Sequence, residues 1–329
     1  MKQRKLGQNG PTVSAVGYGA MSFADFYGPA TDTGSMKILD ACVDLGVTHI
    51  DTSNVYGMGR SESVIGEWLK QRGGTSPFTI ATKGGITRDP NQTRNNEPAH
   101  LQQALDASLT RLGVDAIDLY YVHRRDPRFE IEDVTETLAG FVKAGKVKSI
   151  GFSEIAPSSL RRAHAVHPVA AVQSEYSLST RSPELGLVQT CAELGASLVA
   201  FSPVGRALLT DRPHQADAIA DLAFLKSNPR FIEPNLSANL SYNAKFRVLA
   251  ADMGVAAATL AIAWLVHGGT HVLPIPGTRK LAHLRELAAG GEMDLSPEDI
   301  SRIEEILPIG WAHGDRYSAG QWLGPERYC

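Results

Sequence analysis

The sequence predicts an α/β protein folded as a closed (β/α)8 barrel, or TIM barrel, and three observations support this fold class. Eight short apolar runs alternate along the chain with eight longer segments of helical periodicity. The runs are apolar throughout, as strands are when helices cover both faces of a parallel sheet. No Pro- or Gly-rich linker divides the chain, so residues 1–329 are expected to form a single domain.

The elements follow in order from the N-terminus. The stretch RKLGQNGPTVSAV predicts an N-terminal β-hairpin that turns at Asn9-Gly10. Ser61 is expected to cap the second helix, and Gly46 and Gly113 are expected to end the first and third. Strands are expected over 14–19, 47–51, 78–83, 116–123, 146–153, 169–174, 197–203 and 271–276. Helices are expected over 35–46, 61–73, 97–113, 134–146, 156–166, 182–195, 256–269 and 279–291.

Three segments lie outside this alternation. Residues 22–33 form a long first βα loop, and residues 204–255 form a very long seventh one with a further helical pattern around SANLSYNAKFRVLAADMG. Residues 292–329 form a C-terminal tail. Long loops in compact domains usually carry function. We therefore expect both loops to border the site, and the tail to lie over the mouth of the barrel.

Composition and charge limit the function classes. The 32 basic and 35 acidic side chains leave a formal net charge of -3, so neither a nucleic-acid nor a membrane partner is expected. Cys42, Cys191 and Cys329 are too few and too scattered for a disulfide framework or a zinc cluster, and no metal site is expected. The N-terminus has no apolar signal segment, and no run of about 18 apolar residues occurs. A cytoplasmic location is expected, and the oligomeric state stays open.

Three consecutive βα units end their strands in an ionisable residue: Asp51, Lys83 and His123. Each has an ordinary explanation, since such an Asp often caps a helix, a Lys is usually solvated and a His is often structural. Lys83 can also be a Schiff-base lysine. Active sites of (β/α)8 barrels lie where strands end and βα loops begin. Three neighbouring ionisable ends at one mouth therefore favour a catalytic site.

Tyr56 follows Asp51 by five residues and completes a chemically coherent set. A phenol has a pKa of about 10 and is a poor acid near neutrality. A neighbouring ammonium such as Lys83 lowers that pKa, whereas burial raises it. Asp51 can hold the lysine in place, and His123 can hydrogen-bond and polarise a substrate oxygen. The set predicts a general acid beside a carbonyl-orienting group, which contributes roughly 10²–10⁴ in rate.

Seven motifs together resemble those of the aldo-keto reductases: HIDTSNVYGMGRSESVIGEWL, IATK, RLGVDAIDLYYVH, GFSE, VQSEYS, VAFSPVG and PIPGT. The likeness runs in order from about residue 4 to residue 317. It looks like the short-tailed microbial and plant branch of that family, which is related to the β-subunits of potassium channels. The resemblance implies NADPH-dependent reduction of aldehydes and ketones to alcohols, with Tyr56 as the proton donor and Asp51, Lys83 and His123 completing a tetrad.

The resemblance also implies a set of cofactor contacts outside any Rossmann domain, and GYGAMS and GMGRSE indeed lack the third glycine of G-x-G-x-x-G. Ser153 and Gln173 match the positions that hold the nicotinamide carboxamide, and Phe201 matches the aromatic residue stacked on that ring. The remaining implied contacts are Gly19, Met21, Asp51, Glu154, Ser202, Pro203, Val204, Gly205, Gly277, Thr278, Arg279, Lys280 and Glu286.

The choice of nicotinamide rests on the last helix. Arg279 and Lys280 match the region of the adenosine 2′-phosphate, where two cations favour NADPH over NADH. The same two residues can also form a solvated first helical turn. The family motif usually ends in Glu-Asn, and this chain has Glu286-Leu287. Glu154 likewise stands where many members carry Asn. The strictness of NADP over NAD therefore stays open.

The substrate is expected to be a small carbonyl compound that contacts Tyr56, His123, Phe26 and Arg124. Arg124 can meet an anionic group or form a surface salt bridge. Two other classes stay open: a barrel lyase that uses Lys83 as a Schiff base, and a cofactor-binding regulatory subunit with little turnover. The sequence does not name the physiological substrate.

Overall fold

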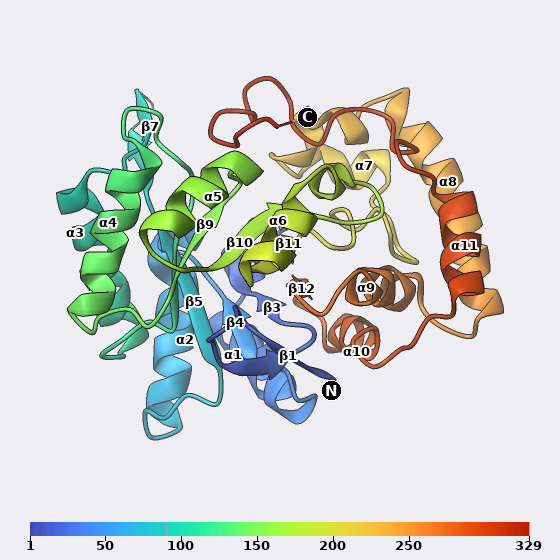
Figure 1. Ribbon diagram of the computed structural model, residues 1–329. Coiled ribbons are helices and arrows are strands. Elements are labelled where there is room, and N and C mark those ends of the chain that lie inside the picture. Colours follow the sequence, from blue (N-terminus) through green and yellow to red (C-terminus); the bar gives the residue numbers. More distant parts are fainter. Residues whose placement is uncertain (90, 329) are drawn as a thin grey trace.

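A sheet of eight parallel strands curled into a barrel forms the centre of the protein in a computed structural model, which describes residues 1–89 and 91–328 (Figure 1). The strands neighbour one another in chain order, and the predicted (β/α)8 barrel is confirmed. They are β3 (Tyr18–Gly19), β4 (His49–Asp51), β5 (Thr79–Gly84), β8 (Leu119–Val122), β9 (Ile150–Ser153), β10 (Val169–Glu175), β11 (Ser197–Phe201) and β12 (Val272–Pro274).

The first and last strands of the barrel meet through two backbone hydrogen bonds. Gly17 N–H donates to Pro274 O over 2.9 Å, and Gly19 N–H donates to Pro276 O over 3.0 Å. A Cβ added to Gly277 would lie 2.4 Å from the Gly19 carbonyl oxygen. Because glycine has no Cβ, the two edges approach closely enough to close the barrel.

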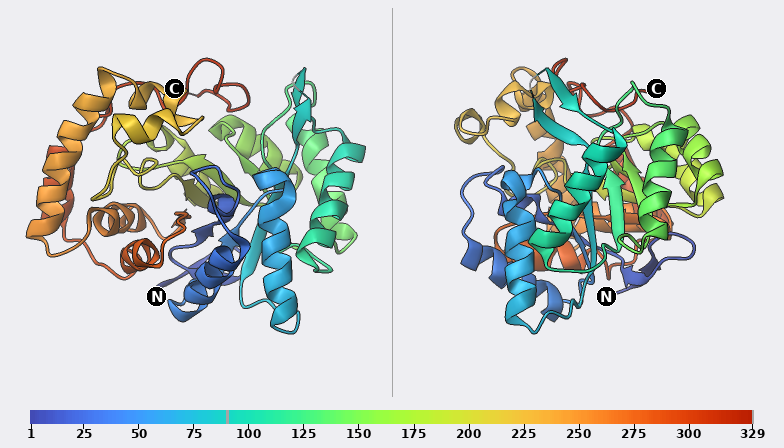
Figure 2. Two further views of the ribbon diagram at one scale, coloured as in Figure 1. Left: turned by 180° about the vertical axis from the view of Figure 1, so that it is seen from behind. Right: turned by 90° about the vertical axis from the view of Figure 1, so that its left-hand side faces the viewer.

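Helices surround the sheet in each view (Figure 2). Those of the repeating units are α1 (Asp32–Asp44), α2 (Arg60–Gln71), α3 (Pro98–Leu112), α4 (Ile131–Lys143), α5 (Pro157–Val166), α6 (Leu187–Leu194), α9 (Ala257–His267) and α10 (Leu281–Ala289). Outside the repeat lie α7 (Ala216–Ala220), α8 (Asn235–Asp252) and α11 (Pro297–Ile306). The expected helix in the long seventh loop is thus confirmed as α8, and α11 was not predicted.

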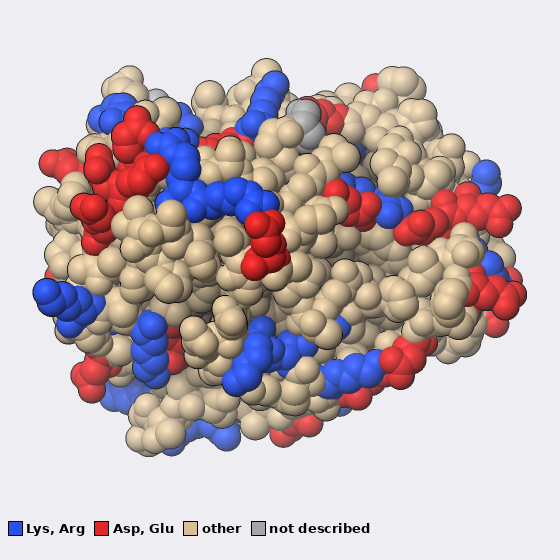
Figure 3. All heavy atoms as spheres, viewed as in Figure 1, with Lys and Arg blue, Asp and Glu red and all other residues tan. Residues whose placement is uncertain are grey.

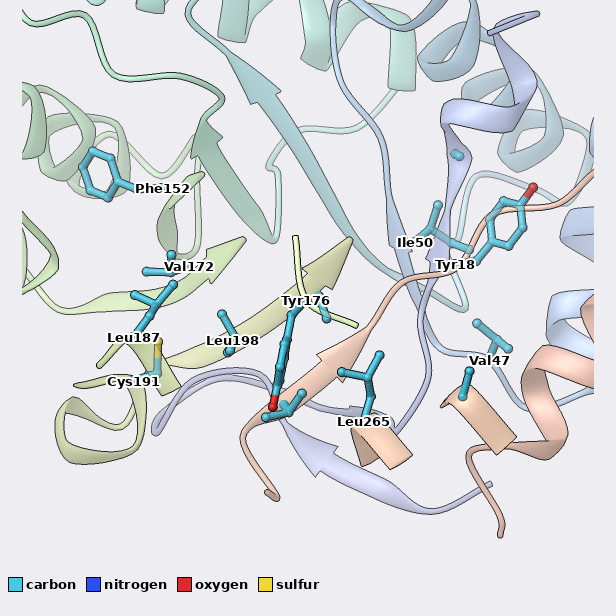
Figure 4. Close-up of a cluster of buried hydrophobic side chains, with 14 of the residues drawn as sticks. Tyr18, Val47, Ile50, Phe152, Val172, Tyr176, Leu187, Cys191, Leu198 and Leu265 are labelled. Carbon is cyan, nitrogen blue, oxygen red and sulfur yellow. The ribbon is translucent and has the colours of Figure 1, made fainter. Parts of the chain in front are cut away.

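Side chains alternate between two cores along each strand. One set packs between the sheet and the helices, and Figure 4 shows part of it, with Ile50, Val172 and Leu198. The alternate set fills the barrel interior and includes Tyr121 and Val199. The period of two therefore decides which strand residues can reach the axis of the barrel.

The N-terminal hairpin, β1 (Gln3–Lys5) and β2 (Thr12–Ser14), closes one end of the barrel. Leu6 and Val13 belong to the interior cluster. The hairpin is confirmed, but its turn lies one residue earlier than predicted, because Gly10 N–H bonds to Gly7 O over 3.2 Å. The N-terminus lies at this end and the tail crosses the opposite end (Figures 1 and 2).

Some predicted boundaries were wrong for local reasons. α2 is capped by Gly59 and not by Ser61. The Ser61 hydroxyl is buried and bonds to Thr52 Oγ1 and Ala20 O, 2.8 and 2.9 Å away. The predicted helix over 182–195 is broken at Gly186, whose φ is 128°, so α6 begins at Leu187. A second hairpin, β6 (Ile86–Asp89) and β7 (Gln92–Arg94), follows β5 and was not predicted.

The cysteines, the helix lengths and the surface charge bear on three further expectations from the sequence. Cys42 and Cys191 are buried free thiols, and Cys329 lies outside the described residues. Within the described chain no single helix is long and apolar enough to cross a membrane; α8 and α9 reach that length together but bend by 87° between them. On the face drawn in Figure 3, acidic and basic side chains are interspersed.

Glycine at position 151 is predicted to be required in β9. An added Cβ would lie 2.6 Å from the Tyr121 ring and 2.7 Å from Ala171 O, so Gly151→Ala should destabilise the fold by about 1–3 kcal/mol. Gly140, an exposed α4 residue with no atom near its added Cβ, is the control, and Gly140→Ala should stabilise by about 0.5–1 kcal/mol. Urea unfolding measures both, and a Gly151→Ala variant as stable as wild type would contradict the packing described.

Candidate active site

The candidate site residues at the strand ends converge because every second side chain of each strand points into the barrel. Tyr121 is the interior residue of β8, and it pairs with Lys83 on β5 and with Gly151 on β9. Gln173 on β10 pairs with Ser153 on β9 and with Val199 on β11. Lys83, Ser153 and Gln173 therefore all face the axis of the barrel near the ends of their strands.

Lys83 is completely buried and contacts three other groups of the site. Its ammonium pairs with Asp51 Oδ1 and donates to Thr52 O over 2.8 Å and to the Tyr56 hydroxyl over 3.4 Å. Burial lowers the pKa of Lys83, but Asp51 and Tyr56 raise it by more, so it lies above its ordinary value. Lys83 is therefore a charged ammonium aimed at the phenol.

Tyr56 begins a short 3-10 helix, Tyr56–Gly59, in which Gly57 and Met58 have left-handed φ values of 56° and 63°. Its ring lies 5.0 Å from the Lys83 ammonium and 5.8 Å from the His123 ring, at 82° to it. Burial raises the pKa of Tyr56, Lys83 lowers it, and the result lies above the ordinary value. The lysine thus offsets part of the burial effect, and the phenol stays protonated near neutrality.

His123 directly follows β8 and extends its ladder, since its N–H donates to Gly84 O over 2.8 Å. Its Nδ1 lies 3.1 Å from Ser53 Oγ, which leaves Nε2 for a substrate. Burial, the Arg124 charge and the Lys83 charge all hold the pKa of His123 well below its ordinary value. The imidazole is therefore neutral and suits a hydrogen bond to a carbonyl oxygen.

The second oxygen of Asp51 accepts a hydrogen bond from Gln173 Nε2 over 2.8 Å. Ser153 Oγ accepts one from Arg124 Nη1 over 3.0 Å. Of the two residues expected to hold a carboxamide, Gln173 thus contacts Asp51, and Ser153 is the register partner of Gln173 on β9. Gly19, at the end of β3, is the register partner of Asp51, and Met21 follows in the 3-10 helix Ala20–Phe23.

The loop after β11 has an unusual backbone. Phe201 is half-buried at the strand end, and Pro203 and Val204 follow within the loop. Ser202 and Arg206 have left-handed φ values of 50° and 56°. Such a conformation costs a residue other than glycine about 1–3 kcal/mol and is concentrated at functional sites. Gly205 closes the turn, with its N–H donating to Ser202 O over 2.8 Å.

The start of α10 is joined to the first βα loop (residues 20–31). The Arg279 guanidinium donates to Pro29 O over 2.5 Å and also to Tyr27 O. Thr278 O accepts a hydrogen bond from the Tyr18 hydroxyl over 2.6 Å. Gly277 and Lys280 are exposed on either side of these contacts. Two cations therefore stand at the beginning of a helix, beside the loop that borders the mouth.

The Glu286-Leu287 pair divides between surface and core. Glu286 is half-buried, and Leu287 is 4% exposed and packs with Val16 and Ile262. Leu287 therefore contributes to the packing of α10 against the barrel rather than to the surface.

A buried ion-pair network lies at the mouth. Glu175 pairs with Arg206, Arg230 and Arg316, and Glu154 pairs with Arg316 over 2.5 Å. Burial raises the pKa of Glu175, but the three arginines lower it by more, so this carboxylate stays charged. The network joins the seventh loop (residues 202–256) and the tail (residues 292–328) to the ends of β9 and β10.

A row of aromatic rings crosses the same region. Phe26 of the first loop packs on Phe224 of the seventh loop, with centroids 5.4 Å apart. Phe224 meets Tyr317 at 6.2 Å, and Tyr317 meets Trp322 at 5.4 Å. The predicted tail over the mouth is thus held by ring contacts as well as by charge. One face of the Phe26 ring is therefore occupied by the contact with Phe224.

Sequence reasoning missed Arg206, Arg230, Arg316 and Glu175. Glu175 ends an apolar strand, which is a signal that a buried acid needs a cation. Nothing local indicates which arginine supplies it, because Arg316 lies 162 residues from its partner Glu154. Within the described residues, no group of three or more His, Cys, Asp or Glu side chains could hold a metal ion.

Comparison with known proteins places this geometry in a family. Residues 15–308 match the model of the Aldo/keto reductase family. The chain is 38% identical over 323 residues to the aldo-keto reductase yakc [NADP(+)] of Schizosaccharomyces pombe, covering 96% of this chain and 94% of that one. It is 37% identical over 322 residues to aldo-keto reductase str7 of Strobilurus tenacellus, covering 95% and 94%.

Two solved structures have a similar fold over most of this chain. Glycerol dehydrogenase AKR11B4 from Gluconobacter oxydans superposes with a TM-score of 0.81 at 25% identity, covering 93% of this chain and 94% of that one. The thermostable aldo-keto reductase Tm1743, solved with the inhibitor epalrestat, gives 0.75 at 26% identity, covering 93% and 100%. With a family match over most of its length and relatives of 37–38% identity, the chain belongs to the aldo-keto reductase family.

Proposed function

We propose that this protein reduces aldehydes or ketones to alcohols with NADPH, and that Tyr56 donates the proton. One observation carries the proposal: the buried Lys83 ammonium reaches both Asp51 and the Tyr56 hydroxyl, the latter over 3.4 Å. Such a placement biases a phenol toward releasing its proton to a developing alkoxide.

The donor set fits a dinucleotide phosphate. Arg279 and Lys280 are exposed cations at the start of α10, where a helix N-terminus also favours an anion. Phe201 offers a half-buried aromatic face on β11, and its register partner Glu175 lies two residues beyond Gln173 on β10. The relative from Schizosaccharomyces pombe is named for NADP(+), which supports the same cofactor here. When bound, the reduced nicotinamide supplies a hydride to the carbonyl carbon.

The chain's own residues then have separate tasks. His123 Nε2 orients the carbonyl oxygen and polarises it as a neutral hydrogen-bond partner. Tyr56 gives its proton to that oxygen, and Lys83 stabilises the phenolate that remains. Asp51 keeps the lysine charged, and Gln173 fixes Asp51 through its second oxygen. Each task needs the groups to be placed before the substrate arrives, and the barrel strands do this.

Two other functions are less well supported. A Schiff-base lyase needs a neutral lysine amine, whereas the pKa of Lys83 is raised by Asp51 and Tyr56 against the effect of burial. A regulatory subunit with little turnover has no need of an assembled acid. Borohydride trapping of a carbonyl substrate on Lys83 would support the first alternative. A stable partner complex with negligible NADPH oxidation across an aldehyde panel would support the second.

Tyr56→Phe should retain NADPH binding and lose about 10²–10⁴-fold in kcat for aldehyde reduction, because only the proton donor is removed. Steady-state kinetics together with NADPH titration by fluorescence separates the two effects. Tyr242→Phe, on α8 and packed against Trp311, is the matched control and should leave kcat unchanged. Near wild-type turnover in Tyr56→Phe refutes the assignment.

Lys280→Met should weaken NADPH binding about 10-fold and leave NADH binding within about threefold, since a charged hydrogen bond to phosphate is worth about 1.5–3 kcal/mol. Lys280 has no hydrogen bond from its ammonium within the described residues, so its removal tests charge alone. Arg279→Met should also weaken NADPH binding more than NADH binding. It should weaken both somewhat further, because the first loop loses its hydrogen bonds to the guanidinium. Equal weakening of both dinucleotides by Lys280→Met would place the 2′-phosphate elsewhere.

A further inference from the structure

We propose that Arg124 is a specificity-determining residue that selects carbonyl substrates carrying a carboxylate. The proposal rests on the reductase function proposed above and names the substrate class for that site. Four observations carry it: the position of the guanidinium, its free edge, its lack of an acidic partner, and the charge around it.

Arg124 holds its guanidinium between two strand ends at the mouth. Its Nη1 donates to His123 O over 2.7 Å and to Ser153 Oγ over 3.0 Å, so it spans the ends of β8 and β9. From the other side, the tail lies against its aliphatic stem, since a Cβ on Gly324 would be 3.1 Å from the Arg124 Cγ and Cδ. The side chain is thus fixed next to the histidine that is proposed to orient the carbonyl.

The opposite edge of the same guanidinium is free. Within the described residues, neither Nε nor Nη2 of Arg124 donates to a protein acceptor, and neither is a buried unsatisfied atom. These two nitrogens form the side-on edge through which arginine binds a carboxylate with two parallel hydrogen bonds. Arg124 therefore holds, beside the ends of β8 and β9, a fixed guanidinium edge that could bind a carboxylate.

No carboxylate of the described chain neutralises Arg124, and its neighbour shows the contrast. Arg125 pairs with Glu326 of the tail, whereas Arg124 forms no ion pair in the described part of the chain. Nor does the nearby network supply a spare acid. Its two glutamates, Glu154 and Glu175, already face three arginines. A half-buried cation in a positively charged surrounding favours an anionic ligand.

Geometry limits which anions fit. The carbonyl must reach Tyr56 and His123, and the carboxylate must reach the adjacent Arg124. The two functional groups therefore have to sit on one compact substrate, separated by a short chain or a ring. The chemical class is an aldehyde or ketone with a carboxylate a few bonds away, such as a semialdehyde acid or an aromatic carboxyaldehyde.

The test compares 4-carboxybenzaldehyde with benzaldehyde as reduction substrates for wild type, Arg124→Met and Arg124→Lys. Losing a bidentate charged contact should raise KM for the carboxylate in Arg124→Met by about 10–100-fold. Benzaldehyde has no carboxylate, so the readout is the ratio of the two KM values, and KM for benzaldehyde should rise by much less than KM for 4-carboxybenzaldehyde. Arg124→Lys keeps the charge but not the edge, and should recover part of the loss. Arg125→Met, the matched control, should leave the preference between the two aldehydes unchanged.

Arg124 could instead act only by holding Ser153 in place for the cofactor. NADPH affinity, measured by fluorescence, distinguishes this role from selection of the substrate carboxylate. In Arg124→Met the loss of preference for the carboxylate should exceed any loss of NADPH affinity, whereas a purely structural arginine would weaken NADPH and both aldehydes together. Equal losses for both aldehydes, or none for either, overturn the selection and leave the reductase proposal standing. A wild type that reduces neither aldehyde nor any other carbonyl overturns both.

Discussion

A lysine buried inside a barrel has to keep its charge, and the proposed active site depends on how this is achieved. Lys83 is completely buried, so without a partner it would lose its proton. Asp51 supplies that partner, and Thr52 O accepts a further hydrogen bond. The remaining donor direction reaches Tyr56. A group that would be costly anywhere else in the core thus acts as a fixed electrostatic bias on one phenol.

The barrel makes this pair possible because strand alternation and register are rigid. β4 and β5 are parallel neighbours: Asp51 pairs with Ala81, and Lys83 lies two residues further along β5 on the same inward face. The glycines at the seam between β3 and β12 let the sheet close around them. The seventh loop and the C-terminal tail cover the ends of β9 and β10. Ion pairs and aromatic contacts, rather than strand hydrogen bonds, hold this cover in place. Strands hold Asp51 and Lys83 beside Tyr56, the proposed proton donor, and the loops and tail border the proposed substrate site.

The sequence allowed the fold and the clustering of Asp51, Tyr56, Lys83 and His123 to be predicted, because the signals are local. Asp51, Lys83 and His123 each end an apolar run, and alternation assigns them to one face. The cover could not be predicted, since Arg316 meets Glu154 across 162 residues with no local pattern to link them. The prediction that Ser61 caps α2 was wrong for a related reason. Its hydroxyl is buried and bonds to Thr52, which is distant from any local helix-capping pattern. Burial also decided the net direction of the Tyr56 pKa, which sequence alone does not determine.

The pKa of Tyr56 with and without its lysine tests the central claim most directly. Ultraviolet difference titration against matched Tyr56→Phe proteins isolates this phenol in wild type, in Lys83→Met and in Asp51→Asn/Lys83→Met, the last of which removes both charges. We expect a pKa above the ordinary tyrosine value in wild type, and one higher still by about one unit or more in both variants, because the cation that opposes burial is gone. An unchanged Tyr56 pKa in both variants would contradict the account.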